Sequence, residues 1–395
     1  MARKDIGKKP EELDMLLSPS RGLQGDEDEV TSLRNPDVQA RFRQHIDEKL
    51  RRWATAFPPS STTTAEQRRR RDEELGIILL DLRKLREGIT SIRRIDAFAC
   101  EVYEASALLS LFASNNPQLS SSLPHLVHDL HPALSATSPV PSTDTLVDSF
   151  TSLSLASRPP PDAATRAFFL ALHLLHSHLL PAFTSSSLSS PAPSTPSTLS
   201  SSSPPLSTFL PTLLALLSSS HLPPPSPLSP PTARTHHNPH ITLLLRLYTS
   251  LLHSSHVFLS RLLSALPPPP PGVAAHLKAL HLPPSFDPLA ALLRSHTAAL
   301  RERRIWPVLE KAYRLPPMAG ADKVGEWVGR GLLFELDARL DGVCADERSN
   351  GKKEPVGESW EDEPDEGEGQ RRAIAAEAVK RAEEFVAAKK TGGRA

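Results

Sequence analysis

Residues 75–112 read LGIILLDLRKLREGITSIRRIDAFACEVYEASALLSLF, and this stretch decides the fold. Two runs of apolar residues recur at three- and four-residue steps, which is the spacing of one face of an amphipathic helix. The first run comprises Leu75, Ile78, Leu79, Leu82 and Leu85, and the second comprises Ile95, Phe98, Val102, Ala105, Leu109 and Phe112. Between the two runs, the helical pattern is interrupted at Gly88, Ile89 and Thr90. We therefore expect a helical hairpin that turns near Gly88 and carries a basic flank at its connection.

The neighbouring segments carry helix start and stop signals. Asn35 followed by a proline is typical of a helix start, and Pro58 with the next proline ends that helix. Thr64 and Gln67 match a capping box, which would open the helix leading into the hairpin. Further helices are predicted at 119–130, 163–180, 209–217, 240–266, 273–280, 288–310 and 371–390.

The composition favours a long, interrupted helical chain. Its 395 residues would allow two or three domains, but there are 40 prolines, 5% aromatic residues and several Ser-Pro tracts. The net charge is zero, so local charge must be considered instead. The two cysteines, Cys100 and Cys344, indicate no disulfide framework, and Cys100 is expected to be a small core residue. No apolar run reaches the roughly 18 residues of a membrane span.

The histidines cluster without indicating a metal site. Fifteen of the 16 lie between His125 and His296, and two groups have spacings that resemble metal-binding patterns. The first group comprises His125, His128 and His131, and the second comprises His173 and His176. Leu, Ser, Pro and His share cytosine-rich codons and are all enriched in this region, so base composition explains the set. We predict no metal ligand and no cofactor.

No catalytic motif stands out either. The sequence has no glycine-rich phosphate loop, no GxSxG and no HExxH. Glu101 and Glu104 lie three residues apart and could form a pair of catalytic carboxylates. A solvated or salt-bridged helix edge near Arg93 and Arg94 is favoured instead. We therefore predict that the chain is not an enzyme and has no catalytic residue.

The hairpin also resembles a known family. Leu-Arg-Lys-Leu-Arg at 82–86, Phe98 and Glu-Val-Tyr-Glu at 101–104 are similar to a signature of PCI-domain proteins of the SAC/GANP type. In those proteins Leu-Arg-x-Ile-Arg is followed by a Phe twelve residues after the second Arg, and then by Glu-Val-Tyr-Glu. The chain departs from the family at 115–118, where Asn-Asn-Pro-Gln replaces Asn-Gln-Cys-Gln.

Three later segments resemble the second half of the same domain. They are 243–248 with Val257 and Phe258, then 311–316, and then 328–335. With the hairpin they extend the resemblance over about residues 75–340. The residues that carry it as structural motif positions are Arg83, Arg86, Phe98, Glu101, Tyr103, Glu104, Tyr313 and Phe334.

The resemblance implies a mostly all-α fold: stacked helix pairs (an α-solenoid) ending in a small winged helix, with long disordered Ser/Pro-rich insertions. Strands would be confined to about 315–345. The predicted parts are a disordered tail at 1–30, a helical-repeat part at 31–300, a winged-helix-like end at 301–345, an acidic linker at 346–370 and a C-terminal helix and tail at 371–395. The insertions would lie near 135–160, 182–207 and 218–239.

The resemblance also implies a function, that of a non-enzymatic scaffold in nuclear RNA metabolism, within an mRNA export or splicing-linked complex. Its partners would be protein subunits of that complex and RNA or single-stranded DNA, with no membrane and no small-molecule substrate. The location would be nuclear, and a cytoplasmic share is also compatible. The alternative is a PCI subunit of a large assembly such as the proteasome lid, without nucleic-acid binding.

Two basic runs bear on that choice. The first candidate set for phosphate contact is Arg301, Arg303, Arg304, Lys311, Arg314, Lys323 and Arg330, and its alternative is the polar face of a surface helix. The second run is Arg-Arg-Arg-Arg at 68–71, where a solvated helix face is favoured over a nucleic-acid or nuclear-import role. Acids at 72–74 partly cancel its charge.

Overall fold

The computed structural model describes residues 32–58, 64–137, 161–181, 208–217, 238–252, 261–262, 265–301, 306 and 366–392. Most of these residues are helical and none of them lies in a strand, which confirms the mostly helical prediction for this part of the chain. Within it no helix is both long and apolar enough to cross a membrane. The predicted winged helix and the Ser/Pro insertions lie almost entirely outside the described residues and stay predictions, as do the domain boundaries.

The chain divides into two compact units. The first is drawn from Met1–Leu174, Leu210–Asn238 and Pro269–Pro288, and the second from Leu175–Phe209, Pro239–Pro268 and Leu289–Ala395. The helical elements are α2 (Pro36–Ala56), α3 (Ala65–Ser91), α4 (Ala97–Phe112), α5 (Asn116–His125), the π-helical turn η1 (Leu126–Leu130), α6 (His131–Thr137), α7 (Ala163–Leu174), the π-helical turn η3 (Leu175–Leu179), α9 (Phe209–Leu216), α10 (Pro239–Leu252), α12 (Pro271–Ala279), α13 (Pro288–Leu300) and α17 (Glu366–Gly392).

The first two helices begin where the sequence predicts. Asn35 caps α2, and its Oδ1 accepts the backbone N–H of Asp37 at 2.9 Å. The capping box of α3 is complete: Thr64 Oγ1 accepts the Gln67 N–H at 3.3 Å, and Gln67 Oε1 accepts the Thr64 N–H at 3.0 Å. These bonds satisfy backbone donors that a helix start leaves open.

The predicted hairpin forms, but it turns later than expected. Helix α3 continues through Gly88 to Ser91, and α4 begins at Ala97. Gly88 is buried, and a Cβ on it would lie 2.6 Å from the carbonyl oxygen of Leu33. The glycine is therefore needed for close packing of two backbones rather than for a turn. Ile95, expected in the apolar stripe, lies in the connection and is 53% exposed.

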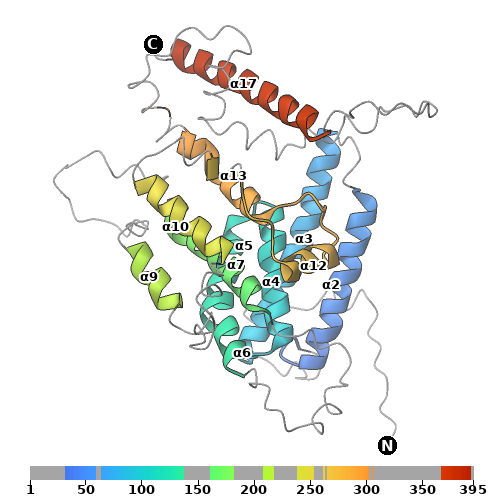
Figure 1. The fold of residues 1–395 in the computed structure, drawn as a ribbon. Helices are drawn as coiled ribbons and strands as arrows, with labels where there is room; N and C mark the ends of the chain where they lie inside the picture. The colour runs from blue at the N-terminus through green and yellow to red at the C-terminus, as the bar shows by residue number, and fades with distance from the viewer. Residues whose placement is uncertain are drawn as a thin grey trace, which may run out of the picture. The chain divides into compact units, whose positions relative to one another are not determined.

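Successive helices of the first unit pack on one another. Figure 1 shows α2, α3 and α4 side by side, and contacts join α2 to α3, α3 to α4 and α4 to α5. Between α2 and α3, the Lys49 ammonium lies 2.6 Å from a carboxylate oxygen of Asp81, which is buried. The ring of Phe112 at the end of α4 meets Trp53 of α2 edge-on, with centroids 5.8 Å apart. The ring of Phe286 also lies edge-on to Phe112, with centroids 5.1 Å apart.

The arginine run at 68–71 lies on the solvated face of α3, as favoured. Arg69 pairs with Glu73 at 2.9 Å and Arg70 with Glu74 at 3.2 Å, and all four side chains are well exposed. Exposed pairs one helical turn apart contribute little to stability.

Helix α5 runs into α6 through the π-helical turn η1. The backbone N–H of His131 bonds the carbonyl of Leu126, five residues back, instead of four. Pro132 follows directly and has no N–H to donate. An extra residue in one turn rotates all later side chains by about 100° around the helix axis. This rotation sets the direction of His131.

The second unit contains α10, α17 and nearly all of α13. The ring of Trp306 lies edge-on to Phe385 of α17, with centroids 5.5 Å apart. Arg301 follows α13 and is only 7% exposed. Burial, and then the charge of His176, lower the pKa of His296 to about 4.

Replacing Gly88 by alanine tests the packing of α3 against the Leu33 segment. The added Cβ would clash with a backbone oxygen, so Gly88→Ala should lower the free energy of unfolding by about 1–3 kcal/mol. Gly76→Ala is the matched control in the same helix, because nothing lies within 4 Å of its added Cβ. There the better helix propensity should raise stability by about 0.5–1 kcal/mol. Urea unfolding followed by circular dichroism measures both, and equal effects would contradict the packing.

Candidate functional site

The side chain of Glu104 lies at the centre of the first unit, with only 1% of the residue exposed. Its Oε1 lies 3.4 Å from Nε2 of His131 on α6, and its Oε2 lies 3.2 Å from Nδ1 of His276 on α12. Both histidines are also buried. An ionised carboxylate only accepts hydrogen bonds, so each histidine donates through the nitrogen named. One carboxylate thus joins three helices that are distant in the sequence.

The two histidines decide the charge of this carboxyl. Burial alone would raise the pKa of Glu104, because it disfavours the charged form. The hydrogen bonds from His131 and His276, together with their charges, outweigh burial and hold the pKa of Glu104 below its ordinary value. Glu104 is therefore an ionised group inside the protein, and its charge is compensated by imidazole donors.

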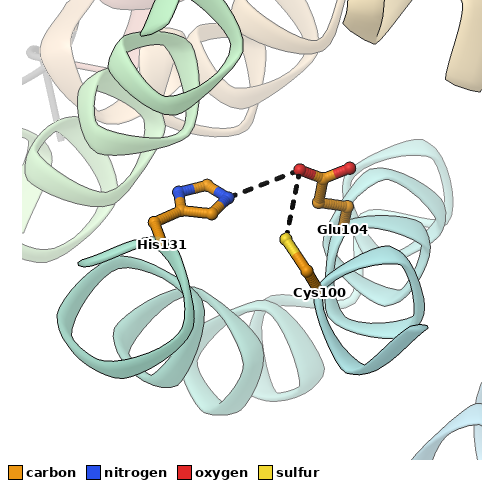
Figure 2. A group of neighbouring side chains, drawn as sticks. All are labelled: Cys100, Glu104 and His131. Carbon is orange, nitrogen blue, oxygen red and sulfur yellow. Dashed lines mark hydrogen bonds and ion pairs between the residues drawn. The ribbon is translucent and has the colours of Figure 1, made fainter. Parts of the chain in front are cut away.

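Cys100 completes the group. It lies one helical turn before Glu104 on α4, is 1% exposed, and its Sγ is 3.6 Å from Glu104 Oε1. Figure 2 shows the side chains of Cys100, Glu104 and His131 pointing toward one another. One ligand-type atom from each lies within 4.8 Å of those of the other two. Cys100 is a small core residue, as predicted, but it faces a charged neighbour.

The prediction of a solvated or salt-bridged helix edge is correct for Glu101 and wrong for Glu104. Glu101 is partly exposed and its Oε1 lies 3.3 Å from Nη2 of Arg43, so it is salt-bridged. Glu104 is neither solvated nor paired with an arginine, and that prediction was wrong. The two positions are about 60° apart around the helix, so Glu101 lies at the partly exposed edge of the face whose interior side carries Glu104. The guanidinium of Arg94 lies instead over the ring of Phe98, 4.3 Å from its centroid.

A second polar network surrounds the buried side chain of Arg86. Its guanidinium donates to Gln118 Oε1 at 2.5 Å and to Ser121 Oγ at 3.0 Å, both on α5. It also lies 5.5 Å from the ring centroid of Tyr103, whose hydroxyl is 2.8 Å from Thr90 Oγ1. Arg86 is only 5% exposed, so it does not belong to the predicted basic flank. It joins α3 to α4 and α5.

An open pocket of about 620 Å³ adjoins this network. Its walls include Arg83, Arg86, Tyr103 and Gln118. Arg83 is exposed, and its Nε lies 2.9 Å from Glu87 Oε1. On this wall Arg83 is thus ion-paired with Glu87, and Arg86 is hydrogen-bonded to neutral side chains.

The histidines with suggestive spacing are separated by the fold. His125 lies 2.6 Å from a carboxylate oxygen of Asp129, on its own helical turn. The Nε2 atoms of His128 and His173 are 3.2 Å apart. Only His131 joins the Glu104 group. The spacing of histidines in the sequence does not indicate which of them meet in the fold. His276, which contacts Glu104, lies 172 positions after it in the sequence.

Most of the predicted phosphate-contact set lies outside the described residues. Arg303, Arg304, Lys311, Arg314, Lys323 and Arg330 belong there, as do the motif positions Tyr313 and Phe334. Arg301 is described, and it is buried. Phosphate contact by this set stays a prediction.

Comparison with protein-family models, with curated proteins and with solved structures finds no match to this chain. The resemblance to PCI proteins of the SAC/GANP type therefore stays a prediction that rests on the residues quoted for it.

The Arg86 network can be tested by a matched pair of variants. Arg86→Ala leaves Tyr103 and Gln118 without a buried cation and should lower the free energy of unfolding by about 2–3 kcal/mol. Arg83→Ala removes an exposed arginine one turn earlier, whose ion pair is worth no more than about 0.5 kcal/mol. Chemical unfolding followed by circular dichroism measures both. Equal losses of unfolding free energy in the two variants would contradict a stabilising role for the hydrogen bonds of Arg86 between α3 and α5.

Proposed function

We propose that the chain is a non-enzymatic scaffold of the PCI type that acts in nuclear RNA metabolism. Its helical stack holds protein subunits of an mRNA export or splicing-linked complex. The winged-helix-like end at 301–345 contacts RNA or single-stranded DNA.

The observation that carries the proposal is the position of the residues that resemble the family signature. Arg86, Tyr103 and Glu104 each link α3 or α4 to another helix, and Glu101 links α4 to α2. A helix pair cannot bury its apolar face alone, so a stack of pairs depends on such links. Residues that connect helices in this way support a scaffold role rather than a catalytic one.

The burial of the titratable group supports a non-enzymatic role. Glu104, His131 and Cys100 are residue types that catalyse reactions, but each is at most 1% exposed. A general base must come within hydrogen-bond reach of its substrate. No substrate reaches these atoms without the helices separating.

The identity of the protein partners distinguishes the proposal from its alternative. Affinity capture of the tagged full-length chain from its own cells, followed by mass spectrometry, should recover RNA-processing or export subunits in stable proportion. The Arg86→Ala variant, captured in parallel, should recover less of them because its stack is weakened. Recovery of proteasome-lid subunits instead would replace the proposal with the large-assembly alternative.

The nucleic-acid contact has its own test. The triple variant Arg303→Glu, Arg304→Glu, Lys311→Glu should abolish binding to a generic single-stranded RNA, since it reverses three charges in the candidate contact. Wild-type binding should be modest and should fall steeply with salt, because phosphate contacts release counterions. Fluorescence anisotropy at about 50 mM salt measures it.

A second triple variant serves as the control. Arg68→Glu, Arg69→Glu, Arg70→Glu makes the same change of charge on the exposed face of α3, and it should retain RNA binding. Both variants should keep the wild-type circular dichroism. If the wild-type chain binds neither RNA nor single-stranded DNA at low salt, the nucleic-acid part of the proposal fails. An equal loss of RNA binding in both variants would show that only the total charge of the chain matters, and it would contradict a contact at residues 303–311.

A further inference from the structure

We propose that Cys100, Glu104 and His131 bind a zinc ion that joins α4 to α6, with His276 holding the second oxygen of the carboxylate. This inference concerns the interior of the first unit. It does not depend on the chain being a PCI scaffold.

The donor set selects the metal. A cysteine sulfur, an imidazole nitrogen and a carboxylate oxygen are all zinc ligands. Magnesium and calcium prefer oxygen alone, and the sulfur of Cys100 disfavours both. Three protein ligands leave one position of a tetrahedral ion, which a water molecule would complete.

The distances around Glu104 Oε1 also match the spacing of ligands around a shared ion. Charge-assisted N–H···O bonds are usually about 2.7–2.9 Å long, whereas His131 Nε2 lies 3.4 Å from Glu104 Oε1. Cys100 Sγ lies 3.6 Å from the same oxygen. Around a tetrahedral zinc, with bonds of about 2.0–2.3 Å, ligand atoms are roughly 3.3–3.6 Å apart. The carboxylate oxygen is thus already spaced for zinc from both neighbours.

The charges also balance. A thiolate and a carboxylate together cancel the two charges of Zn²⁺, and His131 binds as a neutral imidazole. A neutral group suits a site where every side chain is at most 1% exposed.

The backbone places the three ligands. Cys100 and Glu104 are four residues apart on α4, so both face the same way. The π-helical turn before His131 directs that side chain toward them. His276 donates to Glu104 Oε2 at 3.2 Å, which is the outer support that a ligating carboxylate normally has. The complete burial assigns the ion a structural role.

Cobalt(II) reports the ligands directly. The purified full-length chain, stripped with a chelator under reducing conditions, should take up about one equivalent of cobalt(II) chloride and show a thiolate-to-cobalt charge-transfer band. Zinc chloride should displace the cobalt. The thermal midpoint of the stripped wild-type chain should rise when zinc is added. This rise needs no substitution, so it remains a test if the ligand variants fail to fold.

Variants assign the band to the site. Cys100→Ser should remove the charge-transfer band, and His131→Gln should weaken cobalt binding at least roughly tenfold. His276→Gln should keep the band but weaken binding by about 10–100-fold. His128→Gln is the control, since it changes an exposed histidine three residues before His131, and it should match the wild-type chain. The proposal is overturned if the wild-type chain binds no cobalt, or if the band survives in Cys100→Ser.

Discussion

The carboxylate of Glu104 is the constraint on which the first unit depends. An ionised group with 1% exposure is stable only when partners surround it. Here the partners are His131 and His276, on helices that the chain reaches 27 and 172 residues later. Loss of one partner from a buried ionic group typically costs about 3–5 kcal/mol. The carboxylate of Glu104 therefore helps to hold both α6 and α12 against α4.

Helix α4 contacts α2, α3, α6 and α12 through polar side chains. Apart from its two ends and Glu101, it is buried all round, as expected of a helix at the centre of a bundle. Tyr103 and Glu104 are adjacent in the chain but face different elements. Tyr103 reaches Thr90 on α3, while Glu104 reaches α6 and α12. The helix carries polar links on more than one face, and a zinc ion at Cys100 would strengthen the link to α6.

Local signals in the sequence predicted the helices well, and non-local contacts caused the errors. The caps at Asn35 and Thr64 depend on residues two or three positions away, so they can be recognised from the sequence. Gly88 was misread as a turn because its cause, the carbonyl of Leu33, lies 55 residues earlier. The candidate site was missed for the same reason. No spacing on α4 indicates that a histidine at position 276 will meet Glu104.

The proposed scaffold with a buried zinc ion would account for both the polar core and the burial of the potentially reactive groups. Zinc-edge X-ray absorption of the purified full-length chain tests for that ion most directly. The account predicts about one zinc per chain, with a single sulfur at about 2.3 Å and nitrogen or oxygen neighbours at about 2.0–2.1 Å. A chain without zinc after exposure to the metal, or a zinc shell without sulfur, would contradict it.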